Sequence, residues 1–158
     1  MLMAELLDAF LAGPRTLRQA LSGITPEQAR ARPIPGKWST LEVVCHLADF
    51  EPIYADRMKR VIAEERPILL SADEKRYAAA LAYQDRDLEE ELSVIELTRK
   101  SLARILGKLP AQALERVGIY RTDGKDEPRT LERFLATITN HIPHHVKFIQ
   151  DKRRALGI

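Results

Sequence analysis

The sequence predicts an all-α protein built as a four-helix bundle, and three observations support that fold class. Apolar residues recur at helical spacing in four long segments of the 158-residue chain. Strand signals are weak throughout. The composition, 45% hydrophobic and 30% charged, is ordinary for a globular protein large enough to bury one substantial core. We therefore expect residues 1–158 to form a single domain.

The first predicted helix runs from about Leu2 to Leu21. Its apolar positions lie on one side of a helix: Leu2, Leu6, Phe10, Leu17 and Leu21. Gly13 and Pro14 fall inside this segment. Because proline cannot donate a backbone hydrogen bond and its ring crowds the preceding turn, we expect a kink or a break there.

The second helix has the clearest start signal in the chain. Ser39 and Glu42 have the spacing of a capping box, in which each side chain bonds the backbone N–H of the other residue. The helix is predicted to run to about Glu65, because Pro67 disfavours helical geometry in the residue before it. Pro52 falls inside the helix and predicts a local bend.

The segment from Pro67 to about Gln84 is expected to be a loop. It is longer than most connections in compact domains, and such loops often border a functional site. The third helix is predicted from near Asp85 to Leu106. Gly107 is a plausible stop for it, because glycine readily adopts the conformation that ends a helix.

The last third of the chain predicts a turn and a fourth helix. Asp123 and Gly124 indicate a tight turn in a polar segment, which leaves open either a small hairpin or a loop. Thr130 is a good N-cap for the fourth helix. Two histidines continue the apolar stripe of this helix, which reads Phe134, Ile138, His141, His145 and Ile149.

The four histidines fall in two short clusters, and three of them occupy positions where a helix would carry a core residue. His141 and His145 are four residues apart, so they stand one turn above the other on one face. A helix offers two imidazoles to one metal ion at this spacing, and a third from another helix would complete a three-nitrogen site with open positions. Because unpartnered buried imidazoles are costly, we predict a metal site at His46, His141 and His145.

Other readings stay open for these and neighbouring residues. His46 taken alone could be a hydrogen-bonded core histidine, and His144 is assigned to the pocket rim or to support of the ligands, with a solvated surface residue as the alternative. Asp49 and Asn140 could orient a ligand imidazole, or could be capping, surface or bundle-bridging polar groups. Cys45 lies about 100° around the helix from His46, so we interpret it as a small buried apolar residue.

Charge and composition disfavour several classes of function. The net charge is +2, and no basic stripe with interleaved aromatic residues suggests nucleic-acid binding. No apolar stretch approaches the ~20 residues that span a bilayer. The single cysteine, Cys45, rules out an internal disulfide and favours a reducing compartment. The N-terminus lacks the basic start of a signal peptide. We therefore expect a cytoplasmic protein with no nucleic-acid or membrane partner.

Three stretches of the chain resemble the DinB-like superfamily, which includes the YfiT-type metal-dependent hydrolases and thiol-S-transferases. They are residues 36–43 (GKWSTLEV), 46–49 (HLAD) and the pattern His-x-x-His-His at 141–145. The resemblance extends over nearly the whole chain. It implies an up-down-down-up four-helix bundle, often a homodimer. It also implies a divalent metal, commonly zinc or nickel, held by His46, His141 and His145. Relatives often carry a histidine where this chain has Tyr120.

The resemblance also implies a function. Some related proteins transfer bacillithiol, mycothiol or glutathione, so we expect a metal-dependent thiol-S-transferase that activates a low-molecular-weight thiol toward an electrophilic substrate. Three neutral ligands leave the charge of an ion uncompensated, which acidifies a thiol or water bound to it. Two alternatives stay open: a metal-dependent hydrolase that activates water on the ion, and a non-catalytic, dimeric, stress-associated binding bundle.

Overall fold

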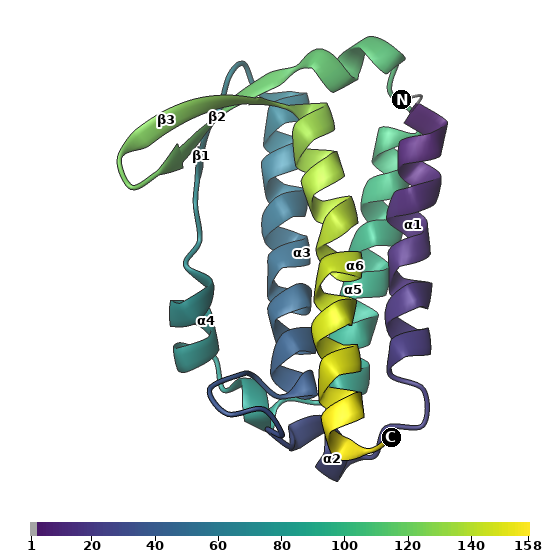
Figure 1. Ribbon diagram of the computed structural model, residues 1–158. Coiled ribbons are helices and arrows are strands. Elements are labelled where there is room, and N and C mark those ends of the chain that lie inside the picture. The colour runs from purple at the N-terminus through teal and green to yellow at the C-terminus, as the bar shows by residue number, and fades with distance from the viewer. Residues whose placement is uncertain (1–2) are drawn as a thin grey trace.

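The computed structural model describes residues 3–158 and shows a four-helix bundle with a small sheet at one end (Figure 1). The long helices are α1 (Met3–Ala20), α3 (Thr40–Ala63), α5 (Leu88–Leu106) and α6 (Leu131–Leu156). Helices α1 and α6 run in one direction and α3 and α5 in the other, which confirms the up-down-down-up order (Figure 1). Helices α1 and α3 each pack against both α5 and α6.

Shorter elements connect the four helices. The helical ones are α2 (Pro26–Arg30), α4 (Glu74–Ala80), η1 (Tyr83–Asp85) and η2 (Ala111–Glu115). The strands are β1 (Ile68–Leu70), β2 (Val117–Thr122) and β3 (Lys125–Thr130). They form one sheet in the order β1-β2-β3, in which β1 is parallel and β3 antiparallel to β2.

This sheet, together with α4, is the main departure from the prediction. Asp123 and Gly124 adopt positive φ angles of 50° and 73° and join β2 to β3, so the hairpin alternative is confirmed. The segment from Pro67 to Gln84 is not a plain loop, because it contains β1, α4 and η1. Strand β1 has three residues, too few for a readable alternation, and its pairing partner lies far along the sequence.

Side-chain caps set the starts of the helices. The Ser39 hydroxyl accepts from the Glu42 amide at 3.1 Å, and the Glu42 carboxylate accepts from the Ser39 amide at 2.6 Å, so the capping box is confirmed. Thr130 caps α6 as predicted. The third predicted helix starts at Leu88 because Asp87, not Asp85, caps it. Leu2, the predicted start of the first helix, lies outside the described residues.

Of the kink or break expected at Gly13 and Pro14, the break does not occur, and the reason is a buried arginine. Helix α1 is continuous through both residues. Pro14 leaves the carbonyl of Phe10 without its helical donor, and Arg99 Nη1 donates to that carbonyl at 2.7 Å. A Cβ on Gly13 would overlap Arg99 Nη1. Gly13 therefore leaves the space, and Pro14 the free carbonyl, that the guanidinium of Arg99 uses.

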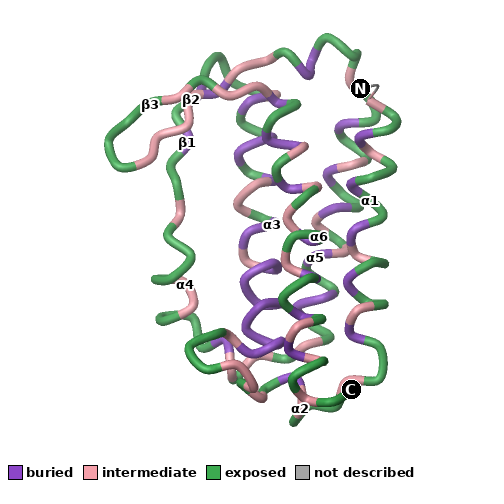
Figure 2. The backbone as a smooth tube through the Cα atoms, in the orientation of Figure 1, coloured by how far each residue is buried: buried purple, intermediate pink, exposed green. Residues whose placement is uncertain are grey.

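Arg99 joins all four long helices in the middle of the core. It extends from α5, donates to Phe10 on α1 and to the Ile138 carbonyl on α6, and pairs with Glu51 on α3 at 2.6 Å. The side chains of Arg99 and Glu51 are buried. Buried residues line the inner faces of the helices, and exposed residues cover the outside (Figure 2). Within residues 3–158, no helix combines the length and hydrophobicity that crossing a membrane requires.

Candidate metal centre

Three of the four histidines meet where α3 and α6 pack together. His46 comes from α3, and His141 and His145 come from α6. One ring nitrogen of each lies within 4.8 Å of the other two. The Nε2 atoms of His46 and His141 are 2.9 Å apart. Two nitrogens bound to one ion at ~2.0–2.1 Å each would be separated by about 3 Å. The structure thus brings together the three histidines that the sequence singled out.

The three imidazoles are neutral at neutral pH. Burial lowers the pKa of His46, which is 1% exposed, to about 4. Burial and the neighbouring imidazoles lower the pKa of His145 to about 3 and that of His141 still further. A neutral imidazole keeps one nitrogen lone pair, and that lone pair is what a metal ion binds.

The cluster cannot satisfy its own hydrogen-bonding capacity. The Nδ1 atoms of His46, His141 and His145 are buried and have no hydrogen-bond partner among the described residues. The Nε2 contact between His46 and His141 satisfies one donor and one acceptor at most. Unsatisfied buried polar groups are rare in folded proteins and mark bound ions, bound waters or functional sites. A divalent cation fits this donor set of three neutral, converging nitrogens.

Glu74 is a neighbour of the cluster that the sequence did not reveal. Its Oε2 atom lies 3.9 Å from His46 Nε2, and its side chain is 55% exposed. It occupies the first turn of α4, which starts there because Asp73 accepts hydrogen bonds from two backbone amides. Glu74 falls in the segment predicted as a loop. The general expectation that this segment borders the site is met, but no local signal identified the residue.

Of the interpretations left open for Asp49, the structure shows a bundle-bridging polar group and not one that orients His46. Arg86 donates to both carboxylate oxygens of Asp49, at 3.0 and 2.8 Å. The same guanidinium also pairs with Glu91, at 2.6 Å. Asp49 acts on His46 only through its charge, which raises the pKa of His46 against the larger effect of burial. Proximity in sequence suggested the contact, but a partner from another part of the chain takes both oxygens.

The remaining candidates occupy the edge of the site or lie outside it. His144 is exposed, and its ring packs edge-on against His145 with 5.1 Å between the centroids, which places it at the rim. Asn140 is exposed on α6. Cys45 is fully buried and donates to the Tyr83 carbonyl, and burial raises the pKa of its thiol to about 12. The interpretation of Cys45 as a small core residue is confirmed.

Aromatic side chains enclose the histidines. The rings of Trp38 and Phe50 lie 5.3 and 4.7 Å from that of His46, and Phe148 lies 5.7 Å from His145. Tyr77, on α4, packs against Phe50 at 5.6 Å. Apolar rings at this distance lower the local dielectric constant around the histidines, which strengthens charge interactions there.

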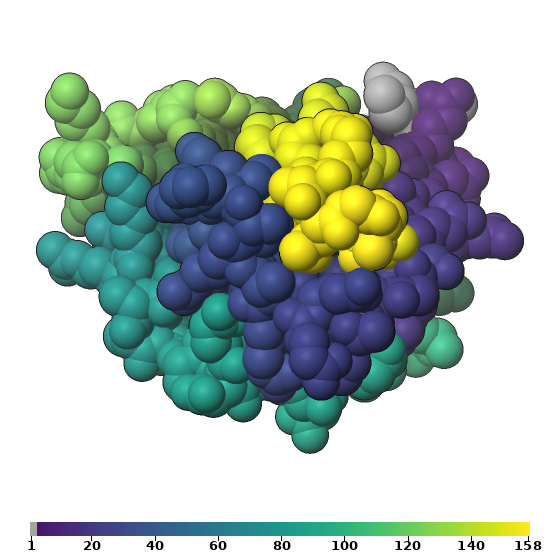
Figure 3. All heavy atoms as spheres, turned by 60° about the horizontal axis from the view of Figure 1, so that its bottom comes forward, coloured from purple at the N-terminus to yellow at the C-terminus, as the bar shows by residue number. Residues whose placement is uncertain are grey.

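A pocket of about 460 Å³ reaches His145 from the surface. Its walls come from the C-terminal half of α6, the segment before α3, and Glu74. Figure 3 shows the first two segments side by side at this end of the molecule. Trp38 and Phe148 provide apolar surface, and Lys37 and Lys152 provide positive charge. The volume suits a small molecule, so the pocket gives a reactant direct access to the histidines.

Comparisons with known proteins agree with this arrangement. A sequence model described as the DinB superfamily matches residues 9–149. The chain is 30% identical over 144 residues to YfiT of Bacillus subtilis, covering 91% of this chain and 80% of that protein. It is 28% identical over 144 residues to a Bacillus licheniformis protein, covering 91% and 81%. Both relatives are named, provisionally, as metal-dependent hydrolases.

The solved structure of Bacillus subtilis YfiT has the same fold. It matches with a TM-score of 0.88 and 25% sequence identity, over 98% of this chain and 87% of that one. That protein is described as having an unusual four-helix bundle topology. The likeness extends to the short elements as well as the four long helices, since nearly the whole chain is covered.

Proposed function

The chain belongs to the DinB superfamily, and from this membership and its histidine cluster we propose that it is a metal-dependent enzyme. His46, His141 and His145 would hold the ion. The observation that carries the proposal is the convergence of three neutral imidazoles, that of His46 buried and the other two partly buried, beside a pocket open to the surface. Imidazole nitrogen suits zinc, nickel, copper or iron better than magnesium or calcium, and we infer zinc or nickel.

Within this class, we propose that the reaction is transfer of a low-molecular-weight thiol to an electrophile. A divalent ion with three neutral ligands keeps its positive charge and an open position, so it lowers the pKa of a thiol or water that reaches it. The chain supplies the surroundings: Trp38 and Phe148 pack their rings against His46 and His145, and the pocket admits a small molecule beside His145. A thiolate attacks without help from a base, and the resemblance to thiol-S-transferases supports this choice.

Hydrolysis is the second candidate, and Glu74 is the observation that favours it. Its carboxylate, 3.9 Å from His46 Nε2, is placed to accept a proton from a water beside the histidines. The names of the two relatives point in the same direction. A general base contributes about 100-fold or more to a rate. Loss of the Glu74 carboxylate should therefore slow hydrolysis strongly and have little effect on thiol transfer.

The test is an assay of zinc- or nickel-loaded protein on matched panels. One panel pairs several thiols with a chromogenic electrophile, and the other contains esters and amides. Thiol transfer predicts conjugation above background that chelation abolishes. Activity confined to the esters and amides would overturn transfer in favour of hydrolysis. No turnover on either panel, in protein shown to hold metal, would favour the non-catalytic binding bundle.

Glu74→Gln sharpens this choice. If the protein transfers thiols, the variant should conjugate within about twofold of the wild-type rate, because no base is needed for the attack. If it hydrolyses, the rate should fall about 100-fold, the typical contribution of a general base. Glu65→Gln is the control, since it removes an exposed carboxylate near the opposite end of α3.

A further inference from the structure

A buried lysine without an anionic partner forms part of the pocket beside His145. Lys152, on α6, is 4% exposed and lines the pocket. Its ammonium donates to the carbonyl of Phe148 at 3.2 Å, and no carboxylate within residues 3–158 forms an ion pair with it. Lysine is almost never fully buried unless it is paired, because removing an ammonium from water is costly. This ammonium therefore has unused capacity to bind an anion.

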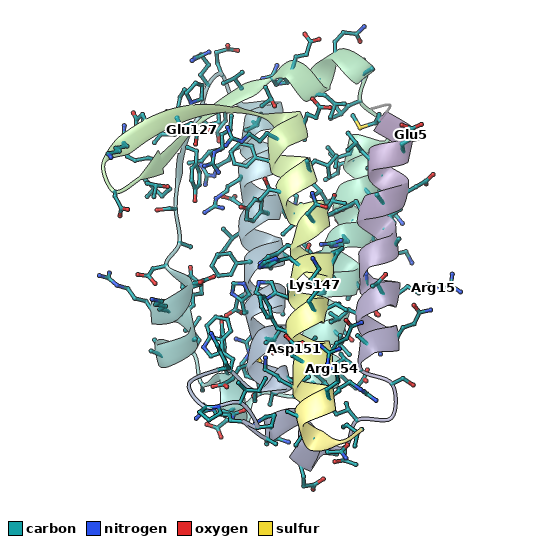
Figure 4. All side chains as sticks on the ribbon, in the orientation of Figure 1. Glu5, Arg15, Glu127, Lys147, Asp151 and Arg154 are labelled. Atoms are coloured by element: carbon teal, nitrogen blue, oxygen red, sulfur yellow. The ribbon has the colours of Figure 1, made fainter. Side chains whose placement is uncertain are left out.

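The nearby carboxylates that act on Lys152 already have other partners. Asp151 pairs with Arg154, on the C-terminal half of α6 (Figure 4). Glu42 pairs with Arg32 and closes the capping box of α3. Their charges reach Lys152 only at a distance, where they oppose the larger effect of burial. Neither carboxylate substitutes for a bound anion.

The position of Lys152 relative to His145 defines the length of a ligand. The two residues are seven apart on α6, so they share one face of the helix. Lys152 bends back to the carbonyl of Phe148, which follows His145 by three residues, or ~4.5 Å along the helix axis. Lys37, on the segment before α3, lines the same pocket. For Lys152, a chain of three or four carbons matches this separation along the helix axis.

We propose that this pocket binds the reacting small molecule through a carboxylate held by Lys152 and Lys37. The other end of the molecule then reaches His145, and Trp38 and Phe148 contact its carbon chain. This assignment rests on the proposed function, because it makes the pocket the substrate site and the thiol a carboxylate-bearing one. Glu74 and Asp151 also line the pocket. Their negative charge disfavours a phosphate dianion more than a singly charged carboxylate.

The test compares three thiols of similar length and different charge. They are 3-mercaptopropionate, 2-mercaptoethanol and cysteamine, each titrated into zinc-loaded protein. Binding is followed by calorimetry and by the fluorescence of Trp38, the single tryptophan of the chain and part of the pocket wall. We expect the carboxylate to bind about tenfold or more tightly than the neutral thiol, the gain typical of a charge-assisted hydrogen bond, and cysteamine to bind most weakly.

Variants test which residues cause the preference for the carboxylate thiol over the neutral one. Lys152→Met should abolish the advantage of 3-mercaptopropionate over 2-mercaptoethanol, and Lys37→Met should reduce it. Lys152→Arg keeps the charge and should keep the advantage, which separates charge recognition from a folding defect. Lys147→Met is the matched control, because Lys147 is exposed on the same helix and does not line the pocket (Figure 4). The Lys147→Met variant should bind 3-mercaptopropionate as tightly as the wild type does.

Butyrate tests the carboxylate site independently of the metal and of the thiol. It has the carboxylate and the chain length but no thiol, so it should alter Trp38 fluorescence in metal-stripped wild-type protein and not in Lys152→Met. Butanol is the neutral reference. If butyrate and 3-mercaptopropionate bind no better than their neutral analogues, the carboxylate site is overturned, whatever the thiols do. If carboxylates bind through Lys152 but metal adds nothing to thiol binding, the carboxylate site stands and thiol transfer fails.

Discussion

Burial decides the charge state of the histidines. His46 is almost fully enclosed, and the aromatic rings around it replace the water that would stabilise an imidazolium. The cost of desolvation outweighs the attraction of Asp49, so the pKa of His46 falls. The same enclosure that keeps the lone pairs free for a cation makes protonation of the folded chain unfavourable.

This charge state predicts how the stability of the metal-stripped protein depends on pH. The folded pKa of His46 is about 4 and that of His145 about 3, against an ordinary value of 6.5. Between these values the unfolded chain binds more protons, so the histidines stabilise the fold above pH 6.5 and lose that contribution as the pH falls. We expect the urea midpoint, measured with chelator present, to decrease from pH 7 to pH 5.

A variant with all three cluster histidines replaced by alanine provides the control. Its urea midpoint should change much less over the same pH range, because most carboxylates titrate below pH 5. An equal dependence on pH in the variant and the wild type would contradict the assignment of neutral, buried imidazoles.

At the scale of single elements, the start of α3 fixes the position of His46. Ser39 bonds the Glu42 amide, and its hydroxyl also donates to the side chain of Gln84 at 2.8 Å. Ser39→Ala should therefore cost about 1–2 kcal/mol of unfolding free energy, at or above the usual value for an N-cap. The measurement is a urea melt. A midpoint equal to that of the wild type would show that neither bond stabilises α3.

Nearby residues in the sequence are enough to predict some elements of the fold and the site, and not enough to predict others. The capping residues Ser39 and Thr130 mark helix starts because a cap acts within one turn of its own sequence. The histidine trio was predictable because imidazoles interrupt two apolar stripes. Strand β1 and Glu74 were not, since pairing with β2 and packing against α3 depend on residues far away in the chain. The choice between the interpretations of Asp49 could not be made from the sequence for the same reason, because Arg86 is distant in sequence.

At the scale of the whole molecule, the buried Arg99 holds the bundle together close to the centre. It bonds groups on α1, α3 and α6 and lowers the pKa of His141 through its charge, after burial and the other two histidines. A local rule, that glycine and proline break a helix, fails at Gly13 and Pro14 because this tertiary contact uses both residues. The homodimer that the resemblance implies stays a prediction, which sedimentation equilibrium would test.

Gly13→Ala tests this contact. The added Cβ would overlap the guanidinium of Arg99, which is held on several sides and cannot move freely. We expect a loss of about 2–4 kcal/mol in unfolding free energy, the range for overpacking combined with disturbance of a buried ion pair. In an Arg99→Met background the same substitution should cost clearly less. Equal costs in the two backgrounds would show that Gly13 is not needed for Arg99.

Metal titration of stripped protein tests the three-histidine centre most directly. Nickel or zinc is added to wild-type protein and to single alanine variants, with calorimetry and Trp38 fluorescence as readouts, since Trp38 lies 5.3 Å from His46. We predict that one ion binds per chain. Loss of His46, His141 or His145 should weaken the affinity for this ion at least tenfold. His144→Ala keeps all three ligands and should change the affinity less than about threefold. Tight one-to-one binding that survives simultaneous replacement of the three cluster histidines would contradict the assignment.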